Sequence, residues 1–475
     1  MLFNSLEFLI FLPLVFLGYW FCFGRSLRLQ NLFVVAVSYV FYGWWDWRFL
    51  LLIALTSSVA WGTGLLIARG HGRMWVAVSL VINLGVLGFF KYFDFFAESA
   101  VGVLEALGFQ AHLPTLRILL PVGISFYTFQ ALSYSIDVYR RSLPAVRDPV
   151  AFFAYISFFP QLVAGPIERA TNLLPQFLRP RVFDAAEAVS GCRLMLWGFA
   201  KKVLVADLCA AQANHLLGLE NPSAPALWVG MVCFAVQIYS DFSGYSDIAI
   251  GCGRLFGIRL MRNFAQPYFS RDIAEFWRRW HISLTTWFRD YLYIPLGGSR
   301  CDRWKRIRNT FVVFLVSGLW HGANWTFVAW GAFHALCFLP LLLAGKNRRY
   351  VTDIVAEGRM LPTFREVWQM GLTFLLVLTG WVFFRAPTIG TAFDWLYGMF
   401  IPHDWCVTGI GLGSLGLRLA LFGVAILFLV EWFNRGRLCP RFPQNRLLRW
   451  LLYYAILAAL LILRPEAQTF IYFQF

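Results

Sequence analysis

Apolar runs long enough to cross a lipid bilayer recur along almost the whole chain, and they exclude most other folds. They lie near residues 7–24, 30–45, 47–68, 74–92, 118–139, 187–212, 225–250, 369–387, 412–434 and 446–464. A helix needs about 20 residues to span the hydrocarbon core, where its backbone polar groups must pair internally. Hydrophobic residues make up 59% of the 475 and charged residues 14%, whereas a soluble domain is about one quarter charged. The sequence therefore predicts an all-α polytopic membrane protein of about ten to eleven spans, in a single domain over residues 1–475.

Basic residues gather in alternate loops, and this pattern predicts the orientation of the chain. Arg25 and Arg28 follow the first run, Arg69 and Arg73 follow the third, and a basic stretch over 435–449 precedes the last. Arginine-rich loops stay in the cytoplasm, so both termini are expected on the outer side. The same bias accounts for the net charge of +16, and no recognition module for nucleic acid accompanies it. We expect membrane lipid, and no nucleic acid, as the partner.

Two further apolar segments are interrupted, and the loop charges alternate only if neither of them crosses the membrane. Residues 149–165 are broken by prolines and glycine, and residues 310–343 are broken by Gly318 and the sequence HGANW. Broken helices occur at membrane depth where they line an enclosed site. We predict two re-entrant segments that line one internal site; two kinked spans are the alternative. Residues 94–115 are expected to form an outer amphipathic helix, and 346–366 a polar cytoplasmic loop.

His281 falls in a basic, aromatic segment with helical periodicity. Over 273–292 the apolar positions recur at intervals of three or four residues, namely Trp277, Trp280, Leu284, Trp287, Phe288 and Tyr291. The polar face carries Arg278, Arg279 and Arg289. This pattern predicts a helix at the cytoplasmic interface, with arginines toward water or headgroups and His281 on the apolar face. A histidine there is either functional or a hydrogen-bonded core residue.

His321 follows an apolar half-helix, with Gly318 and Gly322 allowing close packing or a turn around it. A titratable side chain at membrane depth is a candidate functional residue, because burying it costs free energy. A neutral imidazole can take up a proton near neutral pH. His281, His321 and His334 lack tight ligand spacing, so we expect no metal site. No G-x-S-x-G elbow of a serine hydrolase is present.

A third polar group lies inside an apolar run. Its members are Gln237, Tyr239, Ser240, Asp241, Ser243, Tyr245, Ser246 and Asp247. Such side chains must face a cavity or one another, and we interpret them as support that orients the histidines. In another run, Arg193 is a candidate for attracting an anionic ligand, and we interpret Lys201 and Lys202 as reaching out to the membrane interface.

Three stretches together are recognisable: YSDFSGYSDIAIG, NFAQPYFSRDIAEFWRRWHISLTTWFRDYLYIPLGG and GLWHGANW. They resemble the membrane-bound O-acyltransferase superfamily, in the branch that contains the membrane subunit of bacterial alginate O-acetylation. FFPQLVAGPIER and the C-terminal FIYFQF also look like that branch, so the resemblance covers nearly the whole chain, with its core motifs over 225–345. It implies a bundle of many helices around a central tunnel reached from both faces, in the bacterial inner membrane.

The resemblance also implies an activity. The histidine common to the family falls on His321, and a second histidine that is often functional falls on His281. The family transfers an acyl group from a thioester, here acetyl-CoA, to a hydroxyl. Relatives acetylate alginate, cellulose or peptidoglycan, or supply D-alanine to teichoic acid. We expect an alginate-like exopolysaccharide as acceptor, or an extracytoplasmic acyltransferase that passes the acetyl group on.

The resulting hypothesis gives each group a role. Arginines of the cytoplasmic amphipathic segment 254–308 bind the coenzyme A phosphates, and neutral His321 removes the proton of the acceptor hydroxyl. His281, or a donor such as Asn324 or Trp325, steadies the oxyanion or holds His321 in its tautomer. Direct transfer and an acetyl-histidine intermediate both remain open. The supporting or substrate-binding residues are Asn324, Trp325, Trp280, Tyr239, Asp241, Ser243, Tyr245, Arg278, Arg279 and Arg289. The alternative function is a transporter of an acyl species or small solute, without chemistry of its own.

Overall fold

The computed structural model of the chain is built from helices, and the residues that it describes include no strand. These residues are 1–475 without 111–115, 117–118, 164, 402–404, 408–409, 412, 464–467, 469 and 472–475. Six of the described helices are long and apolar enough to cross a membrane: Trp47–Arg69, Gly72–Ala106, Ala224–Leu255, Trp325–Leu343, Phe364–Arg385 and Leu415–Phe433. A shorter apolar helix covers Leu6–Cys22. The prediction of a helical membrane protein is confirmed, whereas the count of ten to eleven spans stays a prediction.

The chain divides into two compact units. The first consists of Met1–Gly191 with Ala249–Met261, and the second of Cys192–Ile248 with Arg262–Phe475. Two of the three boundaries fall inside helices, α9 (Ala185–Lys201) and α11 (Ala224–Leu255), and the third follows Met261, so each unit combines segments distant in the sequence. The single domain expected from the sequence stays a prediction.

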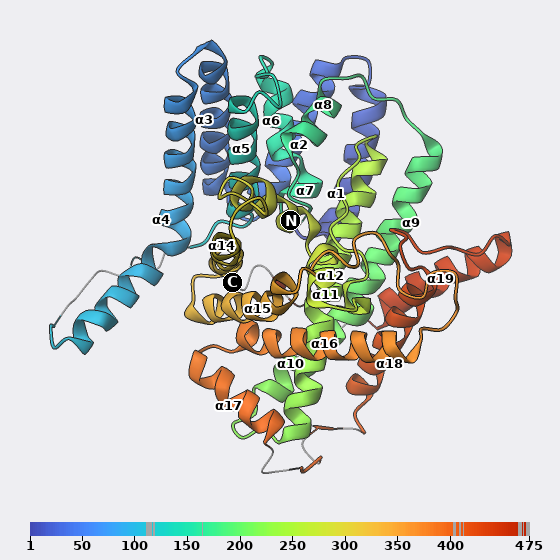
Figure 1. The fold of residues 1–475 in the computed structure, drawn as a ribbon. Coiled ribbons are helices and arrows are strands. Elements are labelled where there is room, and N and C mark those ends of the chain that lie inside the picture. The colour runs from blue at the N-terminus through green and yellow to red at the C-terminus, as the bar shows by residue number, and fades with distance from the viewer. Residues whose placement is uncertain are drawn as a thin grey trace. The chain divides into compact units, whose positions relative to one another are not determined.

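The first unit contains the N-terminal helices. They are α1 (Leu6–Leu17), α2 (Leu27–Gly43), α3 (Leu50–Arg69), α4 (Gly72–Ala106), α5 (Ile124–Tyr139), α6 (Pro149–Ser157), α7 (Phe159–Leu162) and α8 (Ala170–Phe177), with short π- and 3-10-helical turns over Gly18–Cys22 and Trp47–Phe49. Helices α3, α4 and α5 lie side by side, and α4 continues beyond the other two (Figure 1). The helix expected at 94–115 is confirmed over 94–106, where it continues α4, and its outer position stays a prediction. Residues 94–106 belong to α4, because Asp94 and Glu98 are compatible with a helix, and 111–115 lie outside the described residues.

The segment 149–165 is broken, as predicted. Asp148 caps the start of α6 by accepting hydrogen bonds from the backbone N–H groups of Val150 and Ala151. Phe158 then leaves the helical conformation, with φ −50° and ψ 107°, before the short α7. Ala164 lies outside the described residues. Whether this segment is re-entrant in a membrane stays a prediction.

The second unit contains the remaining helices and carries the two histidines. It includes most of α9 and α11, a π-helical turn at Lys202–Ala206, α10 (Asp207–Leu217), a 3-10 turn at Pro267–Phe269, α12 (Ile273–Arg279), α13 (Ile282–Phe288), a π-helical turn at Arg289–Tyr293, α14 (Arg303–His321), α15 (Trp325–Leu343), α16 (Phe364–Arg385), α17 (Ile389–Phe400), α18 (Leu415–Phe433) and α19 (Arg446–Ile462). The polar loop expected at 346–366 is confirmed up to residue 363, after which α16 begins, and its cytoplasmic side stays a prediction.

Helices α14 and α15 form a hairpin in which two glycines let the backbones of the helices come into direct contact. A Cβ added to Gly318 would lie 2.2 Å from the carbonyl oxygen of Phe327, and one added to Gly331 would lie 2.3 Å from that of Phe314. Larger residues at these two positions would force the helices apart. The hairpin tip places His321 at the end of α14 and Asn324 at the N-cap of α15, so the close packing predicted around Gly318 is confirmed.

The continuous helix predicted over 273–292 is wrong, because the chain breaks at His281. Trp280 is extended, and His281 has a left-handed φ of 42°. At this break the backbone forms hydrogen bonds with the non-helical segment 263–265. The N–H of Ile282 donates to the carbonyl of Asn263, and the N–H of Ala265 donates to that of Arg279. Apolar periodicity continues through this break, so the sequence pattern gives no sign of it.

Candidate active site

The structure brings His281 and His321 together, forty residues apart in sequence. Their ring centroids are 6.5 Å apart, and the ring planes lie at 61°. Both side chains are buried, with exposures of 1% and 4%. Two neutral imidazoles at this separation can act on the same reacting group, or one can orient the other.

Aromatic rings surround His321. The centroids of Trp320, Trp330 and Phe384 lie 5.0, 5.1 and 5.4 Å from that of His321, each in an edge-to-face arrangement. These rings come from α14, α15 and α16, and α15 packs against each of the other two. Such walls keep water out and strengthen electrostatic interactions inside the site.

Asn263 holds His281. Its side-chain Oδ1 lies 3.0 Å from Nδ1 of His281 and also accepts a hydrogen bond of 2.9 Å from the hydroxyl of Ser283. Its Nδ2 donates to Oγ of Ser246 over 3.2 Å. An amide oxygen can only accept, so Nδ1 of His281 carries the proton and Nε2 carries the lone pair.

The burial of His281 fixes its charge state. Desolvation lowers the pKa of this imidazole from 6.5 to about 3, which keeps it neutral throughout the physiological range. Asn263, itself fully buried, is a site residue that sequence reasoning missed. Its only signal was a polar side chain at the start of the stretch NFAQP, and nothing in that stretch pointed to His281.

On α11, Ser246 of the polar group and the neighbouring Phe242 both have contacts that lead to His281. Ser246 acts through Asn263, and the ring of Phe242 meets the imidazole edge-on at 4.7 Å. Tyr239 instead donates a hydrogen bond of 2.6 Å to Glu431, while Tyr245 packs against Phe470 at 4.3 Å. The site roles predicted for Tyr239 and Tyr245 stay predictions.

Lys201 and Lys202 do not reach out to the membrane interface, so that interpretation is wrong. Lys201 pairs with Asp247 at 2.6 Å and donates to Ser243 at 2.9 Å. Lys202 is only 1% exposed and pairs with two carboxylates, at 2.7 Å with Asp207 and 2.9 Å with Asp241. Asp241 also accepts a hydrogen bond from the N–H of Ile471. We call Lys201, Lys202, Asp207, Asp241 and Asp247 the ion-pair cluster.

Glycines explain why both lysines turn inward. A Cβ added to Gly198 on α9 would lie 2.6 Å from the carbonyl oxygen of Gly244 on α11, so the two helices touch there. Lys201 and Lys202 follow within one turn and meet the carboxylates of α11 directly. The lysine side chains therefore extend inward to nearby carboxylates and not outward to the membrane surface.

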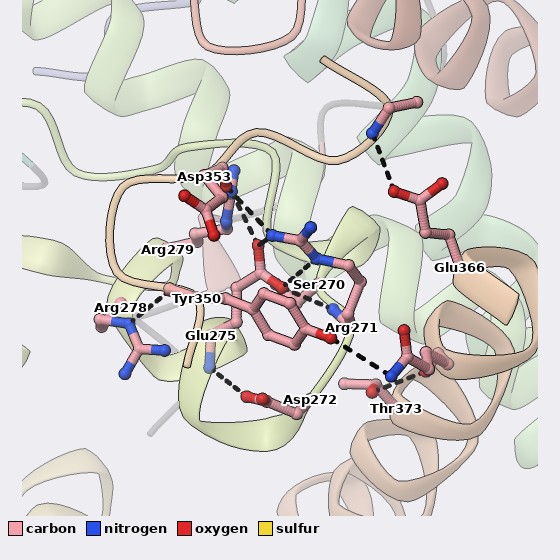
Figure 2. Close-up of polar contacts among 12 residues, drawn as sticks. Ser270, Arg271, Asp272, Glu275, Arg278, Arg279, Tyr350, Asp353, Glu366 and Thr373 are labelled. Atoms are coloured by element: carbon pink, nitrogen blue, oxygen red, sulfur yellow. Dashed lines mark hydrogen bonds and ion pairs between the residues drawn. The ribbon is translucent and has the colours of Figure 1, made fainter. Parts of the chain in front are cut away.

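Arg278 and Arg279 are turned toward protein and not toward water or headgroups (Figure 2). Arg278 donates to the carbonyl oxygens of Tyr350 and Asn347, at 3.1 and 2.8 Å. Arg279 donates to the carbonyl of Asp353 and forms an ion pair of 2.8 Å with the buried Glu275. These two arginines thus fix the loop between α15 and α16.

Arg289, Asn324, Trp325 and Trp280 lie in different environments. Arg289 is 58% exposed and pairs with Asp290 at 2.6 Å. Asn324 caps α15 by accepting from the N–H of Thr326, and its amide donates to the carbonyl of Pro387. Trp325 is 53% exposed. Trp280 is buried against Trp381, with ring centroids 5.0 Å apart. The roles predicted for these residues stay predictions.

Comparison with known proteins identifies the family. Residues 140–353, which contain both histidines, match the model of the membrane-bound O-acyltransferase family. The chain is 43% identical over 441 residues to a probable alginate O-acetylase of Pseudomonas aeruginosa, covering 89% of this chain and 82% of the relative. The chain belongs to the membrane-bound O-acyltransferase family. A probable alginate O-acetylase of Pseudomonas putida is 38% identical over the full length of both chains, and a peptidoglycan O-acetyltransferase of Helicobacter pylori is 34% identical over 84% and 80%.

Family membership makes the chain a membrane-bound O-acetyltransferase and favours this interpretation over the transporter. A chain of this class needs an acyl donor, and the buried histidine pair is its candidate centre for proton transfer. Among the side chains that the structure describes, no group of three or more histidines, cysteines, aspartates or glutamates could hold a metal ion.

Proposed function

We propose that the protein transfers an acetyl group from cytoplasmic acetyl-CoA to a hydroxyl of an extracytoplasmic polysaccharide. An alginate-like exopolysaccharide is the favoured acceptor, because relatives that match over nearly the whole chain are probable alginate O-acetylases. A peptidoglycan O-acetyltransferase is also similar, so peptidoglycan is the second acceptor to test, followed by cellulose. The observation that carries the proposal is the buried pair of His281 and His321, 6.5 Å apart.

His321 is the proposed general base. Its imidazole takes the proton of the acceptor hydroxyl while the oxygen attacks the thioester carbonyl. The new C–O bond forms, the C–S bond breaks, and the proton passes from His321 to the departing thiolate of coenzyme A. Transfer through an acetyl-histidine would use the same residue and remains an alternative to be tested.

Two roles are open to His281: it could stabilise the oxyanion or hold His321 in its tautomer. Its hydrogen bonding favours the second role. Because its Nδ1–H is engaged by Asn263, its neutral Nε2 can accept a hydrogen bond but cannot donate one to an oxyanion. We therefore propose that His281 holds His321 in its tautomer. The ring of Trp320 lies 5.9 Å from His281 and 5.0 Å from His321, and its indole N–H is the kind of donor that the oxyanion needs.

The membrane arrangement belongs to the same proposal. The protein is placed in the bacterial inner membrane as one domain of ten to eleven spans, with both termini outside and re-entrant segments around a central tunnel. Basic side chains of the segment 254–308, such as the exposed Arg289, then face cytoplasmic coenzyme A phosphates. An extracytoplasmic acyltransferase is proposed as the partner that delivers the acetyl group to the polymer.

Purified protein in proteoliposomes tests the function. With acetyl-CoA on the cytoplasmic side, we expect coenzyme A release that increases when alginate or a partner acyltransferase is present outside. A transporter without chemistry would release no free coenzyme A. Release that requires peptidoglycan fragments and ignores alginate would replace the favoured acceptor.

A further inference from the structure

A buried carboxylate lies near His281 on the short helix α12. Glu275 is only 1% exposed and is flanked by two arginines, Arg271 four residues before it and Arg279 four residues after it (Figure 2). Its carboxylate pairs with Nε of Arg271 at 3.0 Å and with Nη2 of Arg279 at 2.8 Å. The mechanism proposed above gives Glu275 no role.

The three side chains carry a net positive charge, and backbone carbonyl groups accept their remaining hydrogen bonds. The carbonyl oxygen of Asp353 accepts from Arg271 at 3.1 Å and from Arg279 at 2.8 Å. The other terminal nitrogen of Arg279, Nη1, donates to the carbonyl oxygen of Ala265 over 3.2 Å. A guanidinium group is planar and rigid, so Glu275, which binds Nη2, determines where Nη1 points.

Ala265 belongs to the segment that holds His281. Two residues earlier, Asn263 bonds to the imidazole of His281 through its side chain and to the N–H of Ile282 through its carbonyl. The N–H of Ala265 donates to the carbonyl of Arg279, so this arginine binds Ala265 through both its backbone and its side chain. The segment is therefore fastened at both of its ends to the turn that carries His281.

This turn needs such support because the backbone of His281 is left-handed, with φ 42°. A residue other than glycine pays a free-energy cost in this region, and the conformation persists where surrounding contacts fix it. A small rotation of the turn would move the imidazole relative to that of His321, whose ring centroid is 6.5 Å away. The contacts of Arg279 therefore bear on the geometry of the histidine pair.

We propose that Glu275 is a positioning residue for acetyl transfer, which fixes the turn of His281 through Arg279. This inference rests on the proposed function, in which His281 holds His321 in its tautomer. Arginine suits the link because its planar fork binds a carboxylate and two carbonyl oxygens at once. One of those carbonyls belongs to Asp353, so the loop between α15 and α16 is part of the same support.

The experiment measures coenzyme A release in proteoliposomes by Glu275→Gln, which keeps the shape of the side chain and removes its charge. We expect kcat per folded molecule to fall about tenfold, because the turn of His281 is displaced. The KM for acetyl-CoA should stay within about twofold of wild type. Thermal unfolding in detergent accompanies each variant. Arg279→Lys keeps the charge and removes the fork, so it should reproduce the loss, and it replaces Glu275→Gln if that variant does not fold.

Glu366→Gln is the matched control. Glu366 is a carboxylate on α16 at the end of the same loop, where it pairs with Arg359 at 2.9 Å and accepts from the N–H of Thr363 at 2.8 Å (Figure 2). These contacts cap the helix, so their loss should lower the unfolding temperature and leave kcat per folded molecule unchanged.

A double-mutant cycle with His281→Gln separates positioning from a merely structural role. If Glu275 acts through His281, adding Glu275→Gln to His281→Gln should lower kcat by less than about twofold further. A further loss of about tenfold in that background, or full activity of a folded Glu275→Gln variant, would overturn the inference. Full activity of His281→Gln, or wild-type protein that releases no coenzyme A, would instead overturn the proposed function on which it rests.

Discussion

The ion-pair cluster and the histidine site both lie in the second unit. Their buried polar side chains compensate for the loss of water in different ways. In the ion-pair cluster, every lysine meets a carboxylate within 2.9 Å. Around His281 and His321 the polar side chains are uncharged, as Asn263 and Ser246 show, and aromatic rings fill the remaining space.

This difference indicates different tasks. Paired charges inside a protein are fixed by their partners, because separating them exposes an uncompensated charge. A neutral imidazole surrounded by aromatic rings can change its protonation state during a reaction. We therefore expect changes at the histidines to affect turnover, and changes in the ion-pair cluster to affect folding.

The largest expected effect is on turnover, from His321→Ala. Loss of the proposed general base should reduce kcat by about 10³-fold, with thermal unfolding close to that of wild type. Coenzyme A release in proteoliposomes provides the rate, and His215→Ala is the exposed control. Full activity in a folded His321→Ala variant would remove this residue from the mechanism.

The Lys202→Met substitution should have the largest effect on stability. It leaves Asp207 and Asp241 without their cation, and breaking a buried pair costs about 3–5 kcal/mol of unfolding free energy. Unfolding in detergent measures this loss, with Lys202→Arg as the charge-conserving control. Turnover per folded molecule should stay within a few-fold of wild type. A folded variant with greatly reduced turnover would show that the ion-pair cluster takes part in catalysis, as the histidines are proposed to do.

Asn263→Ala should produce an intermediate effect, because it frees the ring of His281. Loss of a partner that orients a functional histidine typically costs ten- to a hundredfold in activity, and we expect this in kcat with KM little changed. Ser283→Ala removes another hydrogen bond to the same amide oxygen and should cost less. If the two variants are equally active, Asn263 does not set the tautomer.

The smallest expected effect is the change in unfolding free energy with pH that results from the titration of His281. The pKa of His281 is lowered by burial to about 3, whereas an unfolded histidine titrates near 6.5. Below pH 6.5 the unfolded chain binds a proton that the folded chain does not, so stability falls as pH decreases toward 3. Between pH 7.5 and 5.5 the loss of unfolding free energy is about 1 kcal/mol. His281→Gln should remove this contribution, which a comparison of unfolding at the two pH values measures.

The histidine pair was the most predictable part of the site. His281 and His321 stand out because an ionisable group in an apolar stretch is rare, and both lie in motifs of the family. Asn263 was not predictable from local pattern, because its contact with His281 depends on how the chain folds back at the break. The lysines were misread for a related reason. Sequence shows that Lys201 and Lys202 lie in an apolar run, but not that Gly198 and Gly244 bring carboxylates within their reach.

By itself, the sequence determined that this is a helical membrane protein and which segments are interrupted, and it selected the histidines that are candidates for the site. These properties depend on local composition and on motifs that recur across a family. Only the tertiary structure decided that the helix breaks at His281, that Asn263 fixes its tautomer and that the lysines are paired inside. The physical reason is that hydrogen bonds and ion pairs act over a few ångströms, so they depend on which distant segments meet.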